Sequence, residues 1–283
     1  MQLEKIITLA NKQVEIPFLA MERSLRKTGC QLPLWVIPYS DDTFELPAGA
    51  VWWKDEKVCD WIQAQNGCPV MRKYQCMLEA NYQFIDSDAI FLRNPATVLK
   101  PHRGWVASCC HWHNPGHTHT EASMQILHRK STVWQSRVFN TGQFACDRAL
   151  YDFDALCATA KDPRYRSTIL DNPFHEQPGI NLLVHLTDVA IHNLTLPPFN
   201  MESTWAGDYP DAYERYWTNP DKKPYLIHWA GKKMDQTCPI DQLFYAFLTP
   251  EEARTYNQNL VDKPPKRRLT HQLKKAIRTF REG

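Results

Sequence analysis

The sequence contains no apolar run long enough to span a bilayer and no pattern typical of a secretory leader. Its longest apolar stretch, Leu243–Leu248, has six residues, whereas a membrane-spanning helix needs about 20. The first residues lead directly into the strand-like run Ile6–Ala10, without a basic start or a small-residue cleavage site. We therefore expect a cytoplasmic protein that does not cross a membrane.

Glycine-rich phosphate-binding loops and paired metal-binding cysteines are also missing. Only 10 of the 283 residues are glycine, and the sequence has neither Gly-x-x-x-x-Gly-Lys-Ser/Thr nor Gly-x-Gly-x-x-Gly after its first strand. Their absence argues against P-loop and dinucleotide-binding folds. The nine cysteines form no Cys-x-x-Cys pair and are expected to be reduced thiols. A phosphate ligand would therefore be held by a metal ion and side chains.

The net charge is small but unevenly distributed. It is +2, with 43% hydrophobic and 23% charged residues, a globular composition that excludes disorder, collagen and coiled coil. From Lys263 to the end, eight Lys and Arg face one acid, Glu282, so this segment carries +7 and the preceding chain −5. The sequence predicts one domain over residues 1–262 and a basic tail over 263–283.

The tail has two interpretations. Leu269, Leu273 and Ile277 recur at helical spacing between basic residues, which predicts an amphipathic helix. Such a helix either packs on the preceding domain or associates peripherally with the inner, anionic face of a membrane. Nucleic-acid binding is not expected, because the basic residues are confined to one short segment and the rest of the chain is acidic.

Strand-like and helical patterns alternate along residues 1–262. Strands are expected at Ile6–Ala10, Leu34–Pro38, Tyr82–Ile85, Trp105–Cys109 and Val133–Phe139, and helices at 16–28, in two stretches within 55–80, near 147–161 and near 174–187. Alternation of this kind indicates an α/β fold, with a sheet covered by helices.

Two aspartates, Asp86 and Asp88, follow the predicted strand Tyr82–Ile85 directly. Carboxylates at the carboxyl end of a strand point into the crevice where α/β sheets bind ligands. Hard oxygen ligands suit Mg²⁺ or Mn²⁺ holding a diphosphate. A surface turn with two solvated acids is the alternative for an isolated Asp-x-Asp, so the other motifs of the chain decide between the two.

Four motifs occur in order: Tyr82–Pro95 around Asp86-Ser-Asp88, Phe139–Gly142, Glu176–Asn181 and Ile227–Gly231. Spacings of 52, 37 and 51 residues separate Asp88, Asn140, Gln177 and His228. This set resembles the metal-dependent, retaining nucleotide-sugar glycosyltransferases of the GT-A fold, in particular the family of glycogenin and the lipooligosaccharide galactosyltransferases. The resemblance covers about residues 4–233 and implies a mixed, Rossmann-like sheet with flanking helices.

The resemblance also implies roles for particular residues. Asp86, Asp88 and His228 would bind Mn²⁺ or Mg²⁺, and an O,O,N ligand set favours Mn²⁺ over Ca²⁺. Gln177, Glu176 and Asn140 would lie at the reacting sugar. A UDP-sugar donor would be held by residues matching the family's nucleotide and diphosphate positions: Thr8, Ala10, Asn11, Arg72, Lys73, Asp86, Ser87, Gly231, Lys232 and Lys233. For Arg72 and Lys73, a solvated helix face is an equal alternative.

Two departures from the family pattern bear on the chemistry. Glu176 stands where the family has Asp, which leaves the donor sugar open, and Lys232-Lys233 follow Gly231 in a shifted register. Gln177 is an amide and a poor nucleophile, so the resemblance implies front-face substitution with retention, onto a hydroxyl of a glycan, glycolipid or small molecule. Glu176 as a covalent partner stays open at this point.

Two other functions are compatible with the sequence. A sugar nucleotidyltransferase also combines carboxylates with a divalent ion on an α/β sheet. A non-enzymatic protein that binds metal or a membrane surface would use the basic tail and the histidine-rich segment His111–His119, whose spacings match no standard zinc pattern.

Overall fold

The computed structural model describes residues 1–109, 111–117, 119–170 and 175–262, which fall into two compact units. The first unit is Met1–Phe247, and the second starts at Leu248 and is described as the single helix α9, Pro250–Asp262. The predicted basic tail 263–283 lies outside the described residues. Among the helices of the described chain, none is both long and apolar enough to span a membrane.

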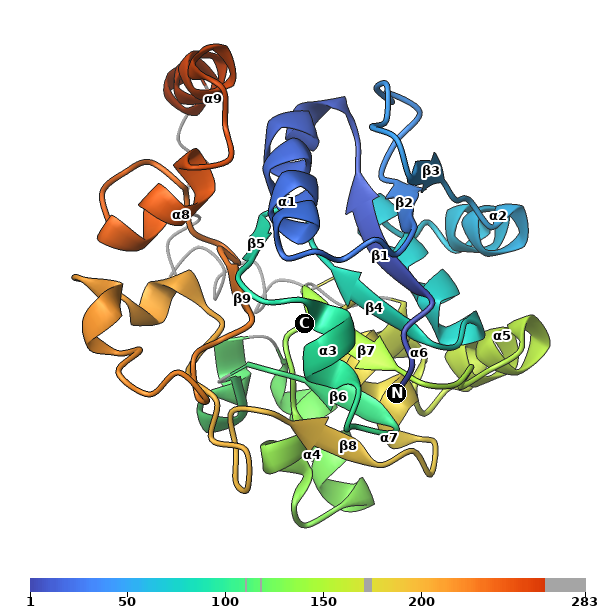
Figure 1. The fold of residues 1–283 in the computed structure, drawn as a ribbon. Helices are drawn as coiled ribbons and strands as arrows, with labels where there is room; N and C mark the ends of the chain where they lie inside the picture. The colour runs from blue at the N-terminus through green and yellow to red at the C-terminus, as the bar shows by residue number, and fades with distance from the viewer. Residues whose placement is uncertain (110, 118, 171–174, 263–283) are drawn as a thin grey trace. The chain divides into compact units, whose positions relative to one another are not determined.

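A seven-stranded mixed sheet forms the centre of the first unit (Figure 1). Its order is β3-β2-β1-β4-β7-β6-β8. The strands β3, β2, β1 and β4 run parallel, β7 is antiparallel to both β4 and β6, and β8 is parallel to β6. Their bounds are β1 Lys5–Ala10, β2 Leu34–Pro38, β3 Ala50–Trp52, β4 Tyr82–Ile85, β6 Trp105–Ala107, β7 Gln143–Cys146 and β8 Ile191–Asn193. The predicted α/β fold with a mixed sheet is confirmed.

A second, two-stranded sheet pairs β5, Ala89–Phe91, with β9, Leu226–His228, in antiparallel orientation. The chain passes from β4 to β5 through Asp86, Ser87 and Asp88. The aspartates therefore lie at the junction of the two sheets.

Alternating side chains of the strands divide the hydrophobic core into two layers. Ile7 and Leu9 of β1 belong to one buried cluster, and Ile6 and Ala10 belong to the other. The first layer packs against helices α2 Glu56–Ala64, α5 Phe153–Lys161, α6 Arg166–Ile169 and α7 Gln177–His185, and the second against α1 Glu15–Lys27 and α3 Pro95–Leu99. Helix α4 Glu121–Lys130 adds Ile126 and Leu127 to the first layer, and the short helix α8 Gln242–Tyr245 follows β9 in the chain.

Local sequence signals account for several helix ends. Asp55 caps α2 by accepting a hydrogen bond from the N–H of Val58 at 3.0 Å, as expected of an acidic N-cap. Helix α1 buries Phe18, Met21 and Leu25 along one face. It stops before Gly29, whose φ of +82° few other residues adopt.

One predicted strand is wrong, and one of the two predicted helical stretches within 55–80 is of the 3₁₀ type. The expected strand Val133–Phe139 contains the 3₁₀ helix Trp134–Arg137 and an extended link to β7. The second helical stretch within 55–80 is a 3₁₀ helix, Pro69–Leu78, which starts with a proline and holds Lys73 and Tyr74 in the core. Short apolar patterns do not distinguish these conformations, because packing on the sheet decides between them.

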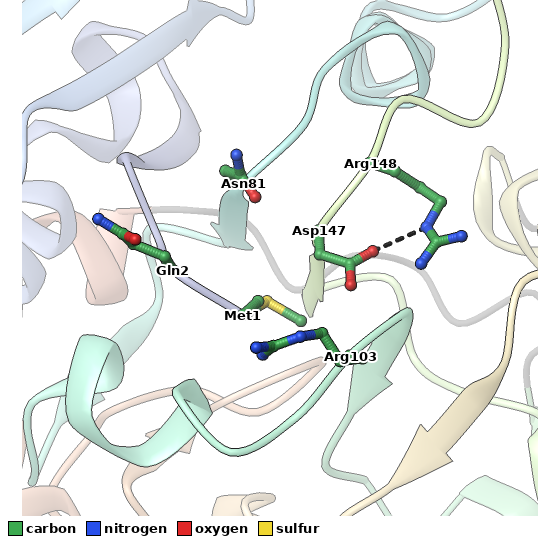
Figure 2. Close-up of a pocket in the computed structure, with 6 residues that line it drawn as sticks. All are labelled: Met1, Gln2, Asn81, Arg103, Asp147 and Arg148. Atoms are coloured by element: carbon green, nitrogen blue, oxygen red, sulfur yellow. Dashed lines mark hydrogen bonds and ion pairs between the residues drawn. The ribbon is translucent and has the colours of Figure 1, made fainter.

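A cavity of about 420 Å³ opens at the amino-terminal end of β1 and β4 (Figure 2). Its lining residues are Met1, Gln2, Asn81, Arg103, Asp147 and Arg148, and Asp147 pairs with Arg148 at 2.9 Å. Because Asn81 precedes β4 and Asp86 follows it, this cavity lies at the opposite end of the strands from the aspartates.

Candidate functional site

Backbone hydrogen bonds hold the two aspartates and His228 at the junction of the sheets. The N–H of Asp86 donates to the carbonyl of Gly142 at 2.7 Å, which extends the β4–β7 pairing by one residue. In the small sheet Ala89 lies opposite His228, and the N–H of Trp229 donates to the carbonyl of Asp88 at 2.9 Å. Strand register therefore brings together residues about 140 positions apart.

The side chains of Asp86, Asp88 and His228 form a compact ligand set. Nε2 of His228 lies 3.1 Å from Oδ1 of Asp88 and 3.8 Å from Oδ2 of Asp86. One ligand atom from each residue lies within 4.8 Å of the others. In the described part of the chain this is the only such group of three His, Cys, Asp or Glu residues. Two carboxylates and an imidazole suit a divalent transition ion such as Mn²⁺, so the residues fit the metal that the sequence predicts.

The three groups are electrostatically coupled. Burial raises the pKa of Asp86, and the neighbouring Asp88 adds to this, while Lys73 and His228 act in the opposite direction. Burial also acts to raise the pKa of Asp88, but the adjacent His228 lowers it below its ordinary value. Burial acts to lower the pKa of His228, and the two carboxylates raise it above its ordinary value. The two carboxylates therefore favour the protonated form of His228.

Lys73 links the metal-ligand set to Glu176. Its Nζ lies 2.9 Å from Oδ1 of Asp86 and 2.8 Å from Oε1 of Glu176, and its side chain is 3% exposed. Burial acts to lower the pKa of Lys73, but the two carboxylates raise it above its ordinary value. Lys73 is therefore a buried cation, and its ammonium group is paired with two carboxylates of the protein.

The loop before β7, which bonds to Asp86 through Gly142, also forms hydrogen bonds with Glu176 and Gln177. The hydroxyl of Thr141 donates to Oε1 of Glu176 at 3.0 Å, and its N–H donates to Oε1 of Gln177 at 3.1 Å. The N–H of Gly142 donates to Oδ1 of Asn140 at 2.7 Å. For the side-chain nitrogens of Asn140 and Gln177, no hydrogen bond forms within the described residues. The oxygens of both amides are therefore held by the backbone of this loop.

Most of the other residues predicted to bind the donor lie in two segments, the first near the end of β1 and the second after β9. Thr8 and Ala10 are fully buried in β1, and Asn11, 5% exposed, follows at the strand end and donates to Oγ of Ser40 at 3.1 Å. Nη1 of Arg72 donates to the carbonyl of Pro38, which ends the neighbouring strand, at 2.5 Å. The side chains of Thr8 and Ala10 are therefore closed to solvent, whereas Asn11 lies at the carboxyl end of β1.

On the other side, the segment after β9 forms a turn at Gly231, whose φ is +69°. Nothing would contact a Cβ at Gly231 within 4 Å. Lys232 is half-buried, with Nζ 3.7 Å from Sγ of Cys238, and Lys233 is exposed. Ser87 is buried between the aspartates.

Three contributors to the site have roles that the sequence motifs do not predict. Thr141 lies within the motif Phe139–Gly142, but only the fold shows its bonds to Glu176 and Gln177. Thr204 accepts a hydrogen bond from the N–H of His228 at 2.7 Å, and Trp205 pairs with His228 in a parallel bridge. In the histidine-rich segment His111–His119, Thr118 and the side chains of His111 and His117 lie outside the described part of the chain.

Comparison with known proteins identifies the fold. No family model and no curated protein sequence matches the chain. Among solved structures, the bifunctional glycosyltransferase WbbM matches with a TM-score of 0.59 and 11% identity, over 92% of this chain and 52% of WbbM. The galactosyltransferase LgtC, in complex with donor and acceptor sugar analogues, matches with a TM-score of 0.57 and 11% identity, over 89% of this chain and 99% of LgtC. The chain spans about half of WbbM and has the GT-A glycosyltransferase fold.

Proposed function

We propose that this protein is a retaining glycosyltransferase that moves a hexosyl group from a UDP-sugar to an acceptor hydroxyl, with Mn²⁺ or Mg²⁺ at Asp86, Asp88 and His228. The observation that carries this proposal is the convergence of all four sequence motifs on one edge of a GT-A sheet. A bound divalent ion would neutralise the diphosphate as it leaves.

The chain's own residues then have distinct tasks. Asn11 and the Gly231 turn would hold the nucleotide and the diphosphate. The amide nitrogens of Asn140 and Gln177 would donate hydrogen bonds to sugar and acceptor oxygens. The acceptor hydroxyl would attack the anomeric carbon on the face from which the diphosphate leaves, and its proton would pass to the leaving phosphate oxygen.

The contacts of Glu176 support substitution on one face rather than a covalent glycosyl-enzyme. Its Oε1 accepts from the ammonium of Lys73 and from the hydroxyl of Thr141, at 2.8 and 3.0 Å. A carboxylate neutralised by a buried cation is a weak nucleophile. We therefore assign Glu176 to positioning, and Gln177 to contact with the sugar.

Calorimetric titration of the whole chain with UDP, with and without Mn²⁺, tests this proposal. We expect metal-dependent binding in the wild type and its loss in Asp88→Asn, with Asp60→Asn as a matched control at an exposed position. A panel of UDP-hexoses should then release UDP. Release of pyrophosphate from a sugar phosphate and UTP would identify a nucleotidyltransferase instead, and wild-type protein that binds no UDP would contradict the proposal.

A further inference from the structure

The segment between β8 and β9 is fastened beside the candidate site at both ends. At its start Thr204 and Trp205 pair with His228. At its end, the N–H of Glu202 donates to the carbonyl of Lys222 at 2.8 Å, and Arg93 donates to the carbonyl of Lys223 at 2.6 Å. The intervening residues form the orange loop that precedes β9 in Figure 1. The loop thus starts beside His228 and returns to the same small sheet.

Four aromatic rings make up the centre of this loop. Tyr209, 1% exposed, lies between Tyr216 and Trp217, with ring centroids 5.3 and 5.5 Å apart and edge-to-face geometry. Tyr213 packs on Trp217 at 4.6 Å, and Nζ of Lys223 lies 5.0 Å from the centroid of the Trp217 ring. The hydroxyl of Tyr209 donates to the carbonyl of Ser203. Tyr209 therefore anchors the cluster to the protein.

The three outer rings differ in exposure. Tyr216 is 37% exposed, and Tyr213 and Trp217 are half-buried. Carboxylates accompany the ring hydroxyls: desolvation and Glu214 raise the pKa of Tyr213, and desolvation and Asp211 raise that of Tyr216. The surface therefore combines flat apolar faces with hydrogen-bond acceptors at their edges.

We propose that Tyr213, Tyr216 and Trp217 form a saccharide-binding platform that holds the acceptor glycan; this inference rests on the proposed transferase function. The apolar C–H face of a sugar ring packs on a flat aromatic ring, and its hydroxyls donate to carboxylates such as Asp211 and Glu214. The loop is joined to His228 through Thr204 and Trp205, so the platform would hold a glycan on the same small sheet as the ligand set.

The charge of the loop selects a neutral glycan over an anionic lipid surface. Residues 203–223 contain four acids and three bases, so the segment has a net charge of −1. Attachment to anionic lipids needs a cluster of cations. The acids next to the exposed rings would repel such a surface, whereas sugar hydroxyls are attracted to them.

Titration of the full chain with neutral tetrasaccharides, in the presence of Mn²⁺ and UDP, tests the platform. The probes are maltotetraose, cellotetraose and chitotetraose. We expect the wild type to bind at least one of them, and Tyr216→Ala and Trp217→Ala to weaken that binding about tenfold. Trp217→Phe, which keeps a flat ring, should lose less. The control is Phe199→Ala, because Phe199 is 40% exposed and contacts His102 instead of the platform.

The readouts distinguish the platform from the transferase proposal. Tyr216→Ala removes an exposed ring and should fold, as circular dichroism will show, and UDP binding should be unchanged in every platform variant. Wild-type protein that binds UDP but no tetrasaccharide, or platform variants that bind tetrasaccharide as the wild type does, would overturn the platform. Wild-type protein that binds no UDP with Mn²⁺ would overturn the transferase function itself.

Discussion

Gly142 and His228 approach so closely that a methyl group at position 142 would lie 2.0 Å from Cε1 of the imidazole. The same methyl group would lie 2.7 Å from Oδ2 of Asp86. The backbone at Gly142 therefore forms one wall of the ligand set, and the side chain of His228 occupies the space that any other residue would need.

Gly142→Ala is expected to weaken Mn²⁺ binding at least about tenfold, because the imidazole must move away from the two aspartates. Calorimetry with Mn²⁺ and UDP measures the change. The matched control is Gly116→Ala, where the nearest heavy atom would be 3.8 Å away. Equal Mn²⁺ affinity in Gly142→Ala and the wild type would contradict the role of this contact.

Lys73→Met is expected to destabilise the protein by about 3–5 kcal/mol, because it leaves the carboxylates of Asp86 and Glu176 without their buried cation. Urea unfolding gives the free energy. Lys12→Met serves as the control, since Lys12 pairs with Glu15 at 2.6 Å but its side chain is 55% exposed; a change below about 1 kcal/mol is expected there. Similar losses in the two variants would argue against a special role for Lys73.

Divalent metal is expected to stabilise the native state. Asp88 contributes to the raised pKa of Asp86, after burial, so the two carboxylates repel each other in the absence of a cation. At a concentration 100 times its dissociation constant, a ligand raises the free energy of unfolding by about 2.7 kcal/mol. For a chain of this size, this corresponds to an increase of roughly 5–10 °C in the melting temperature. Thermal unfolding with Mn²⁺ and then EDTA measures the shift. In Asp88→Asn, Mn²⁺ should raise the melting temperature only slightly. An increase equal to that of the wild type would show that the metal binds elsewhere.

The stability of the fold is expected to fall in mild acid through His185. Burial lowers the pKa of His185, whose Nδ1 lies 2.7 Å from the carbonyl of Asn181. The unfolded chain, with a histidine pKa of about 6.5, then binds the proton more readily than the native state. The contribution of His185 is therefore complete above about pH 6.5 and is lost as the pH falls towards the lowered native pKa.

Urea unfolding at pH 7.5 and pH 5.5 tests this dependence. His185→Gln should lose less stability between the two pH values than the wild type does. The exposed His128 provides the comparison, and His128→Gln should retain the wild-type loss. An identical loss in His185→Gln and the wild type would show that another group is responsible.

Local patterns were sufficient to predict the class of fold. The runs Ile6–Ala10 and Tyr82–Ile85 are buried strands as predicted, because short, mainly apolar runs rich in β-branched and aromatic residues are typical of strands inside a sheet. The same reasoning failed at Val133–Phe139, where a 3₁₀ turn covers part of the segment. Apolar composition alone does not determine conformation where the backbone hydrogen bonds are local.

The sequence by itself determined which chemical groups are available and in what order: two aspartates after a buried strand, an amide pair, and a histidine near the end of the domain. Only the tertiary structure decided that Lys73 lies between Asp86 and Glu176, and that Gly142 contacts His228. These contacts depend on the antiparallel registers of β4 with β7 and of β5 with β9. Register between distant strands arises from the packing of the whole core, which no local stretch of sequence encodes.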